Sequence, residues 1–299
     1  MSPAWGVHAG LQNTSIDELR DLWSQIEALG FEWISVWDHF YAADLVSTNC
    51  LEAVATHTAL AAHTSSVRCG SLVYCAGYRH PAVLANAIAT IDHVSGGRAD
   101  LGLGAGWCEP EYRAYGIPFP SAGVRLDILE ESAECIRSLL RDDSTTFEGE
   151  HFTLTDAVCD PKPVQRELPI WIGGGGERRT LRIVARFADG WNIPFVPPEE
   201  FARKREVLGG HCADVGRDLG EIRCTVNVGV AKDDAALEAQ FGSMAEFVRP
   251  GILTGSRAEM VERVGEYVDA GAEQINVALR APFDRESLEH LAGAVGLGS

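Results

Sequence analysis

The sequence contains no long apolar run and no cluster of basic residues. None of its hydrophobic stretches approaches the roughly 18 residues that span a bilayer, and its first residues lack the basic and then apolar pattern of a secretory signal. The sequence has 25 Lys and Arg residues and 43 Asp and Glu residues, which give a formal net charge of −18. No stripe of basic residues offers a surface for nucleic acid. We therefore expect a cytoplasmic protein that binds neither membranes nor nucleic acids.

Motifs for metals, disulfides and covalent catalysis are missing as well. The eight cysteines include no Cys-x-x-Cys pair and none has a His at ligand spacing, which is typical of reduced, mostly buried thiols and argues against zinc. No Ser nucleophile elbow, P-loop or metal triad is evident. We expect no metal site, and any difficult chemistry must come from an organic cofactor.

What the sequence does contain is a regular alternation of strand-like and helix-like segments. The expected strands are Ala4–Ala9, Trp33–Trp37, Val67–Tyr74, Ala99–Leu103, Pro169–Ile172, Asp189–Ile193, Arg223–Ala231 and Gln274–Leu279. Amphipathic or Ala-rich helical segments follow them, beginning with a capping-box start at Ser15. Eight such units over 299 residues predict an α/β fold, a TIM (β/α)8 barrel.

The barrel prediction carries insertions and one alternative. Residues 141–168, with a small hairpin at Phe147–Leu154, and residues 240–256 are interpreted as insertions in a single domain that covers residues 1–299. An open doubly wound sheet is the other candidate fold. That fold places a glycine fingerprint after its first strand, whereas the first strand here runs into Ala9-Gly10-Leu11-Gln12. The closed barrel is therefore the expected fold.

In a barrel of this type the chemistry lies where the strands end. Asp38 and His39 follow the second predicted strand. His39 is a candidate acid or base, because an imidazole titrates near neutral pH; the alternative is a structural His at a strand end. Asp38 could orient His39 or bind a cofactor edge, or it could simply form a turn.

The stretch after the fourth strand is the most distinctive part of the chain. Ala105, Gly106 and Trp107 combine bare backbone with an aromatic ring, a composition that suits the floor of a ligand site. A packed glycine-rich turn with a core Trp is the alternative. Glu109 and Glu111 follow and are first interpreted as exposed loop carboxylates, although either could act as an acid.

Four consecutive glycines follow the fifth strand. Gly173, Gly174, Gly175 and Gly176 precede a predicted helix over Arg178–Phe187. Free backbone N–H groups at a helix start suit a phosphate, and a plain loop is the alternative. Together with the aromatic loop and His39, these glycines describe a site that holds a cofactor.

Several motifs together resemble the bacterial luciferase-like monooxygenase superfamily. They are Tyr78-Arg79-His80-Pro81, Ala89-Thr90-Ile91-Asp92, Ser95-Gly96-Gly97-Arg98, Gly102-Leu103-Gly104-Ala105-Gly106-Trp107 and Gly116-Ile117-Pro118-Phe119-Pro120. The Asp38-His39-Phe40 triplet and the loop from Trp107 to Tyr112 resemble the branch that uses the deazaflavin coenzyme F420. The resemblance implies a barrel with an insertion, usually a homodimer, whose mouth holds the deazaflavin ring.

The resemblance also implies roles for individual residues. A non-prolyl cis peptide is expected at Ser71–Leu72, behind the ring, and Asp38 is expected near the ring's polar edge. Contacts to the ring or ribityl chain are expected from Ala105, Gly106 and Trp107, and phosphate contacts from Gly173, Gly174, Gly175 and Gly176. His39 matches the acid/base of sugar-phosphate-oxidising relatives. Those relatives carry a catalytic Glu at the position of Trp107, which argues against the same substrate.

Three functions are compatible with these observations. The first is transfer of a hydride between F420 and a small organic molecule, with His39 moving the accompanying proton. The second is an FMN-dependent monooxygenase that uses reduced flavin and dioxygen. The third is a non-catalytic binder on the same barrel, against which His39 and the aromatic loop argue.

Overall fold

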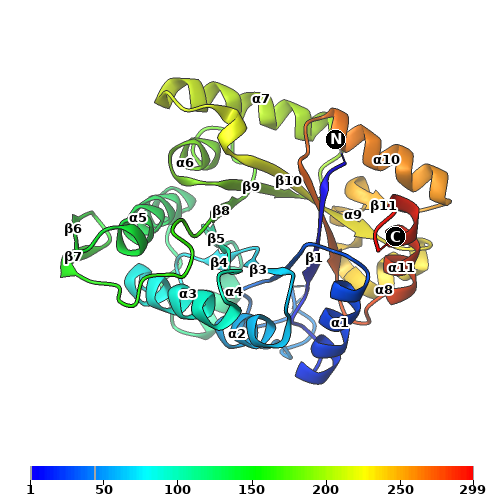
Figure 1. The fold of residues 1–299 in the computed structure, drawn as a ribbon, viewed down its shortest axis with the longest axis horizontal. Coiled ribbons are helices and arrows are strands. Elements are labelled where there is room, and N and C mark those ends of the chain that lie inside the picture. The colour runs from blue at the N-terminus through cyan, green and yellow to red at the C-terminus, as the bar shows by residue number, and fades with distance from the viewer. Residues whose placement is uncertain (1, 44, 299) are drawn as a thin grey trace.

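The predicted strands form a closed parallel barrel (Figure 1). The structure is a computed structural model and describes residues 2–43 and 45–298. Neighbouring barrel strands pair in parallel throughout. The strands are β1 (Ala4–Ala9), β2 (Trp33–Val36), β3 (Arg68–Ser71), β4 (Tyr74–Cys75), β5 (Leu101–Gly104), β8 (Ile170–Gly173), β9 (Gly190–Pro194), β10 (Arg223–Val230) and β12 (Gln274–Leu279).

The barrel closes between β3 and the residues that lead into β5. The strand order is β3-β2-β1-β12-β10-β9-β8-β5-β4. The Cys69 N–H donates to the Arg98 carbonyl and the Asp100 N–H donates to the Cys69 carbonyl, both at 2.8 Å, while β4 pairs with β5. β3 and β4 are thus two parts of the one strand predicted at Val67–Tyr74. This closure confirms the barrel and rules out the open sheet.

The helices surround the barrel (Figure 1). They are α1 (Ile16–Ala28), α2 (Ala53–His63), α3 (Pro81–Ser95), α4 (Glu109–Ala114), α5 (Ala122–Arg141), α6 (Thr180–Phe187), α7 (Pro198–Val215), α8 (Asp234–Phe241), α9 (Ala245–Val248), α10 (Arg257–Asp269) and α11 (Arg285–Val295). Local signals define their ends: Ser15 and Glu18 form the predicted capping box of α1, and α3 begins at Pro81 and ends at Gly96 in a left-handed conformation. No helix in the described part of the chain is long and apolar enough to cross a membrane.

Both predicted insertions are present. Residues 141–168 contain an antiparallel hairpin, β6 (Thr145–Glu148) and β7 (Thr153–Ala157). Residues 240–256 contain the end of α8 and the short elements η2 (Gly242–Met244), α9, η3 (Arg249–Gly251) and β11 (Ile252–Leu253), and β11 pairs with β10. A further 3₁₀ turn, η1 (Leu219–Glu221), precedes β10.

Large aromatic side chains fill the barrel interior. Trp33 and Trp171 are buried with their ring centroids 5.4 Å apart, and they pack against Leu72 and Val73. The Trp33 indole donates to the buried Asp100 carboxylate at 2.7 Å, so its N–H is satisfied inside the core. Leu72 and Val73 also line a cavity above this layer. The packed tryptophans therefore support the floor of the site described next.

Candidate active site

A cavity of about 590 Å³ opens at the ends of the barrel strands. This volume lies within the range of small-molecule and cofactor sites. Its lining comes from residues in the C-terminal parts of, or directly after, β1, β2, β5, β8, β9, β10 and β12. Predicted site residues among them are Asp38, His39, Leu72, Ala105, Gly106, Trp107, Gly173 and Gly174. Ser71, Gly175 and Gly176 are not among its lining residues.

His39 is held by a buried carboxylate. Its Nδ1 lies 2.9 Å from Oε2 of Glu111, and only 13% of the His39 side chain is exposed. A carboxylate can only accept at neutral pH, so the neutral imidazole carries its proton on Nδ1. Nε2 has no hydrogen-bond partner among the described residues, and the ring lines the cavity. The unprotonated nitrogen is therefore available to a ligand.

Glu111 was predicted to be an exposed loop carboxylate, and that prediction is wrong. The residue lies in helix α4 and its side chain is fully buried. Besides His39, it accepts hydrogen bonds from the backbone N–H groups of Phe40 and Tyr41 and from the Tyr78 hydroxyl. Burial raises the pKa of Glu111, but His39 and these donors outweigh it and hold the pKa at about 2. Glu109, with 45% of its side chain exposed, pairs with Arg113.

Asp38 lies beside His39 but binds elsewhere. It accepts from the Arg79 guanidinium, with one contact at 3.0 Å, and from the Cys75 N–H at 2.9 Å. Arg79 also reaches Glu52, which precedes helix α2. Asp38 therefore ties the end of β2 to the segment after β4, and no hydrogen bond joins it to His39 among the described residues.

The non-prolyl cis peptide lies one residue later than expected, at Leu72–Val73 instead of Ser71–Leu72. Ser71 is buried and bonds to both the N–H and the carbonyl of Gly102, so it belongs to the barrel wall. Val73 points between two glycines: a Cβ on Gly104 would lie 2.4 Å from its Cγ2, and one on Gly173 would lie 2.8 Å from its Cγ1. These glycines leave the room that Val73 needs at the cavity floor.

Trp107 forms part of the rim. Its indole is 57% exposed, and its ring centroid lies 5.5 Å from that of His39 in an edge-on arrangement. The alternative interpretation of this stretch was a packed glycine-rich turn with a Trp in the core. The exposed Trp107 contradicts it. Ala105 and Gly106 line the same wall, and the Gly106 carbonyl accepts from Arg125 at 3.2 Å.

The glycine run leads into the start of helix α6. The helix begins at Thr180, two residues later than predicted, and no side chain caps its first turn. Gly173, Gly174 and Thr180 line the cavity. The Gly174 N–H donates to the Asn192 carbonyl, and the Gly174 carbonyl accepts from the Trp191 indole. An uncapped helix start beside bare backbone suits an anionic group such as a phosphate.

Polar lining residues such as His8, Gln12 and Arg280 were not predicted from the sequence. His8 lies in β1, Gln12 follows that strand, and Arg280 directly follows β12. The segment after β10 adds a largely apolar wall. Its apolar members are Phe241, Met244, Phe247 and Val248, and Gln240 adds an amide that donates to the Val230 carbonyl. A signal for Arg280 was present in the sequence, because a cation directly after the last predicted strand stands at the active end of a barrel.

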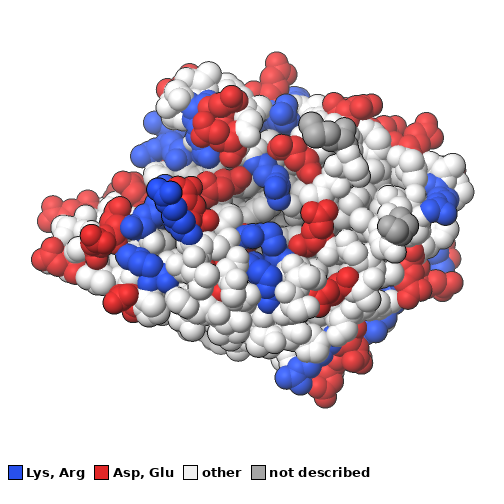
Figure 2. Space-filling model, viewed as in Figure 1, with Lys and Arg blue, Asp and Glu red and all other residues white. Residues whose placement is uncertain are grey.

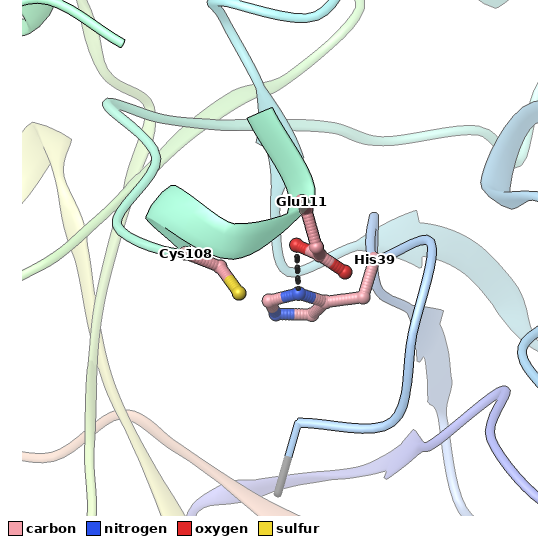
Figure 3. Close-up of side chains that lie close together, drawn as sticks. All are labelled: His39, Cys108 and Glu111. Atoms are coloured by element: carbon pink, nitrogen blue, oxygen red, sulfur yellow. Dashed lines mark hydrogen bonds and ion pairs between the residues drawn. The ribbon is translucent and has the colours of Figure 1, made fainter. Parts of the chain in front are cut away.

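His39, Cys108 and Glu111 form a compact group whose potential ligand atoms all lie within 4.8 Å of one another (Figure 3). Metal binding requires a thiolate and a carboxylate with free lone pairs. Burial raises the pKa of the Cys108 thiol to about 11, and both Glu111 oxygens already accept two hydrogen bonds each. We therefore assign this group to the positioning of His39 and not to a metal.

Residues 3–286 match the luciferase-like monooxygenase family. The chain belongs to this family. The F420-dependent glucose-6-phosphate dehydrogenase of Kineococcus radiotolerans is 33% identical over 62% of this chain and 55% of its own length. Uncharacterized proteins of Mycobacterium bovis and Mycobacterium tuberculosis are 35% identical over 44% of this chain and 46% of theirs. The chain thus spans about half the length of these curated relatives.

Solved structures share the fold. An F420-dependent secondary alcohol dehydrogenase in complex with an F420–acetone adduct has a TM-score of 0.88, with 19% identity over all of both chains. The oxygenating constituent of 3,6-diketocamphane monooxygenase from Pseudomonas putida, in complex with FMN, has a TM-score of 0.79. It is 18% identical and covers 99% of this chain and 98% of its own. The barrel alone therefore does not distinguish the two cofactors.

Proposed function

We propose that this luciferase-like enzyme is an F420-dependent oxidoreductase that acts on a small organic substrate. The observation that carries the proposal is the cavity in which His39, fixed by the buried Glu111, faces a glycine-lined floor. Relatives named as F420-dependent support the choice of coenzyme. Bound F420 supplies a hydride donor or acceptor at C5 of its deazaflavin ring.

The chain's own contribution is proton transfer and positioning. Nε2 of His39 accepts a proton from a substrate hydroxyl during oxidation and returns it to a carbonyl oxygen during reduction. Glu111 keeps the proton on Nδ1 and the ring in one orientation, so the lone pair of Nε2 is available on the cavity side. The apolar side chains of Val73 and Trp107 exclude water from the reacting atoms.

The residues present fit a deazaflavin nucleotide. Val73 supplies an apolar bulge for a flat ring, and Ala105 and Gly106 let the ring or its ribityl chain approach the backbone. In this proposal the uncapped start of α6 holds the phosphate. Gly173 and Gly174 keep side chains out of its way, since the Gly174 N–H already donates to the Asn192 carbonyl. Gly175 and Gly176 lie outside the cavity lining, and the Gly175 carbonyl accepts from Lys204. Asp38, already paired with Arg79, places a polar group near the ring edge.

The first experiment is a pair of titrations of the purified protein with oxidised F420 and with FMN, followed by intrinsic tryptophan fluorescence. We expect tight binding of F420 with quenching of Trp107, and weaker binding of FMN. Trp107→Phe is the matched control: calorimetry should still detect binding while much of the quench disappears. Preferential binding of FMN would overturn the choice of coenzyme, and binding of neither would refute the proposal.

The FMN monooxygenase is the second candidate, favoured by the FMN-bound fold relative. The two functions differ in their use of dioxygen. Oxygen consumption by the protein with reduced FMN, but not with reduced F420, would establish the second candidate. We expect no oxygen consumption coupled to substrate turnover.

We also propose that the enzyme is a homodimer. Helix α2 contains no Asp, Glu, Lys or Arg, and the only one in α3, Asp92, is buried. Figure 2 shows few charged side chains over this part of a chain whose net charge is −18. Val83 and Val94 are 62% and 43% exposed on α3, and a second copy would cover them.

Sedimentation velocity tests the dimer. The double variant Val83→Glu with Val94→Glu should sediment as a monomer, because it places charges in the interface. Val215→Glu is the control, since Val215 is 42% exposed on α7 and lies on another helix. A monomeric wild-type protein would refute this proposal without touching the proposed activity.

A further inference from the structure

Arg280 is a buried cation at the cavity wall, and its charge has no carboxylate partner among the described residues. The side chain is only 7% exposed and lines the cavity. Its Nη1 donates to the backbone carbonyls of His8 and Leu279, at 3.3 and 2.8 Å. Nε and Nη2 have no hydrogen-bond acceptor in residues 2–43 and 45–298. Two donor nitrogens of this guanidinium are therefore unused beside the open cavity.

The surroundings of Arg280 are aromatic and polar but not acidic. The guanidinium lies over the Trp37 ring, 3.9 Å from its centroid, and 5.8 Å from the centroid of Phe241. Asp38 is the one carboxylate among the described lining residues, and Arg79 already binds it. Burial lowers the pKa of Arg280 to about 9, and the group remains cationic at neutral pH.

A buried, unbalanced cation is costly in a protein interior. Such a cost at a cavity wall is repaid when a ligand brings the opposite charge. The planar fork of a guanidinium matches the two oxygens of a carboxylate. We propose that Arg280 binds a carboxylate of the substrate, so that the enzyme acts on a small organic acid with an oxidisable or reducible carbon. This inference rests on the proposed hydride transfer.

The placement of Arg280 relative to His39 supports this assignment. The Trp37 ring touches both residues: its centroid lies 5.0 Å from that of His39 and 3.9 Å from the Arg280 guanidinium. A molecule with a short carbon chain can therefore place its carboxylate at Arg280 while its reacting carbon lies beside Nε2 of His39. The aromatic side chains of Phe241 and Phe247 cover the carbon skeleton between these two groups.

Calorimetric titration of the purified full-length protein tests the inference with two probes of nearly equal shape, phenylacetate and phenylacetamide. We expect phenylacetate to bind the wild type about 10- to 100-fold more tightly than the amide, because it gains charge-assisted hydrogen bonds. Arg280→Gln should remove this preference, and Arg280→Lys should restore part of it. Arg203→Gln is the control, since half of the Arg203 side chain is exposed on helix α7, away from the cavity lining.

Several results would overturn the inference. They are equal affinity for the acid and the amide, no binding of phenylacetate to the wild type, and tighter binding of inorganic phosphate than of phenylacetate. Competition between phenylacetate and F420 would show that Arg280 serves the coenzyme instead. If Arg280→Gln does not fold, the affinities of the wild type for phenylacetate and phenylacetamide still test the inference. If the choice of F420 is wrong but the inference about Arg280 is right, the protein will bind phenylacetate and not F420.

Discussion

Replacement of Glu111 by Gln tests how the site holds His39. The carboxyl has an ordinary pKa of 4.5 and a pKa of about 2 in the folded protein, where its side chain is fully buried. The lowered value means that the folded state favours the ionised form. At about 1.4 kcal/mol per pKa unit, the ionised Glu111 contributes about 3 kcal/mol to stability at neutral pH.

This contribution is present above pH 4.5 and is lost as the pH falls toward 2, because the folded-state pKa is the lower one. We therefore expect Glu111→Gln to lower the free energy of urea unfolding by about 3 kcal/mol at pH 7. The difference from the wild type should narrow as the pH falls from 4.5 toward 2. Glu109→Gln, at an exposed ion pair, should cost less than about 1 kcal/mol.

The same variant has a functional consequence. A Gln at position 111 offers one acceptor where the carboxylate accepts four hydrogen bonds, so the imidazole loses its fixed proton and orientation. Turnover should fall while F420 still binds. Unchanged stability at pH 7, or a difference that stays constant down to pH 2, would refute the reasoning.

Four further predictions concern the cavity and its supports. His39→Gln should lower turnover about 10²- to 10⁴-fold with F420 affinity preserved, whereas the exposed His290→Gln should match the wild type in steady-state assays; equal loss in both would contradict the assignment. Gly173→Ala should push Val73 aside, cost about 1–3 kcal/mol in thermal unfolding and weaken F420 binding; unaltered binding would be inconsistent with a shaped floor. Trp107→Ala should leave urea unfolding within about 1 kcal/mol, because the ring is 57% exposed, yet weaken F420 binding by calorimetry. Arg98→Met should cost about 3 kcal/mol in urea, since four backbone carbonyls lose their donor; a stable variant would show that water replaces the guanidinium.

The barrel could be predicted from the sequence because its strands are short, apolar and separated by helical patterns. The structure reproduces the predicted limits of β1 and β12, Ala4–Ala9 and Gln274–Leu279, without a shift. The third strand was predicted as one piece, but it breaks at Leu72–Val73. Room for that break comes from glycines on β5 and β8, which are distant in sequence, so the local pattern contains no sign of it.

The site was predictable in part. In a parallel barrel the site lies where the strands end. This rule correctly predicted that four residues line the cavity: His39, Ala105, Gly106 and Trp107. Their proposed roles toward a coenzyme stay predictions. Glu111 was misjudged because the groups that bury it lie 33 to 72 residues away in the chain. Hydrogen bonds between distant segments leave no periodicity in a sequence, and an acidic residue near a glycine-rich turn is exposed by default.

The apolar wall of the cavity has a consequence for how the shape of this cavity can change. Phe241, Ala245 and Val248 pack in a small cluster of their own with Phe195, separate from the main core of the barrel. Mutations of Phe241 or Val248 change the shape of the cavity, and they leave the main cluster of core residues unchanged. We therefore expect a focused library in this segment to alter which substrate the enzyme accepts, while the residues of the proposed proton-transfer and coenzyme sites stay unchanged.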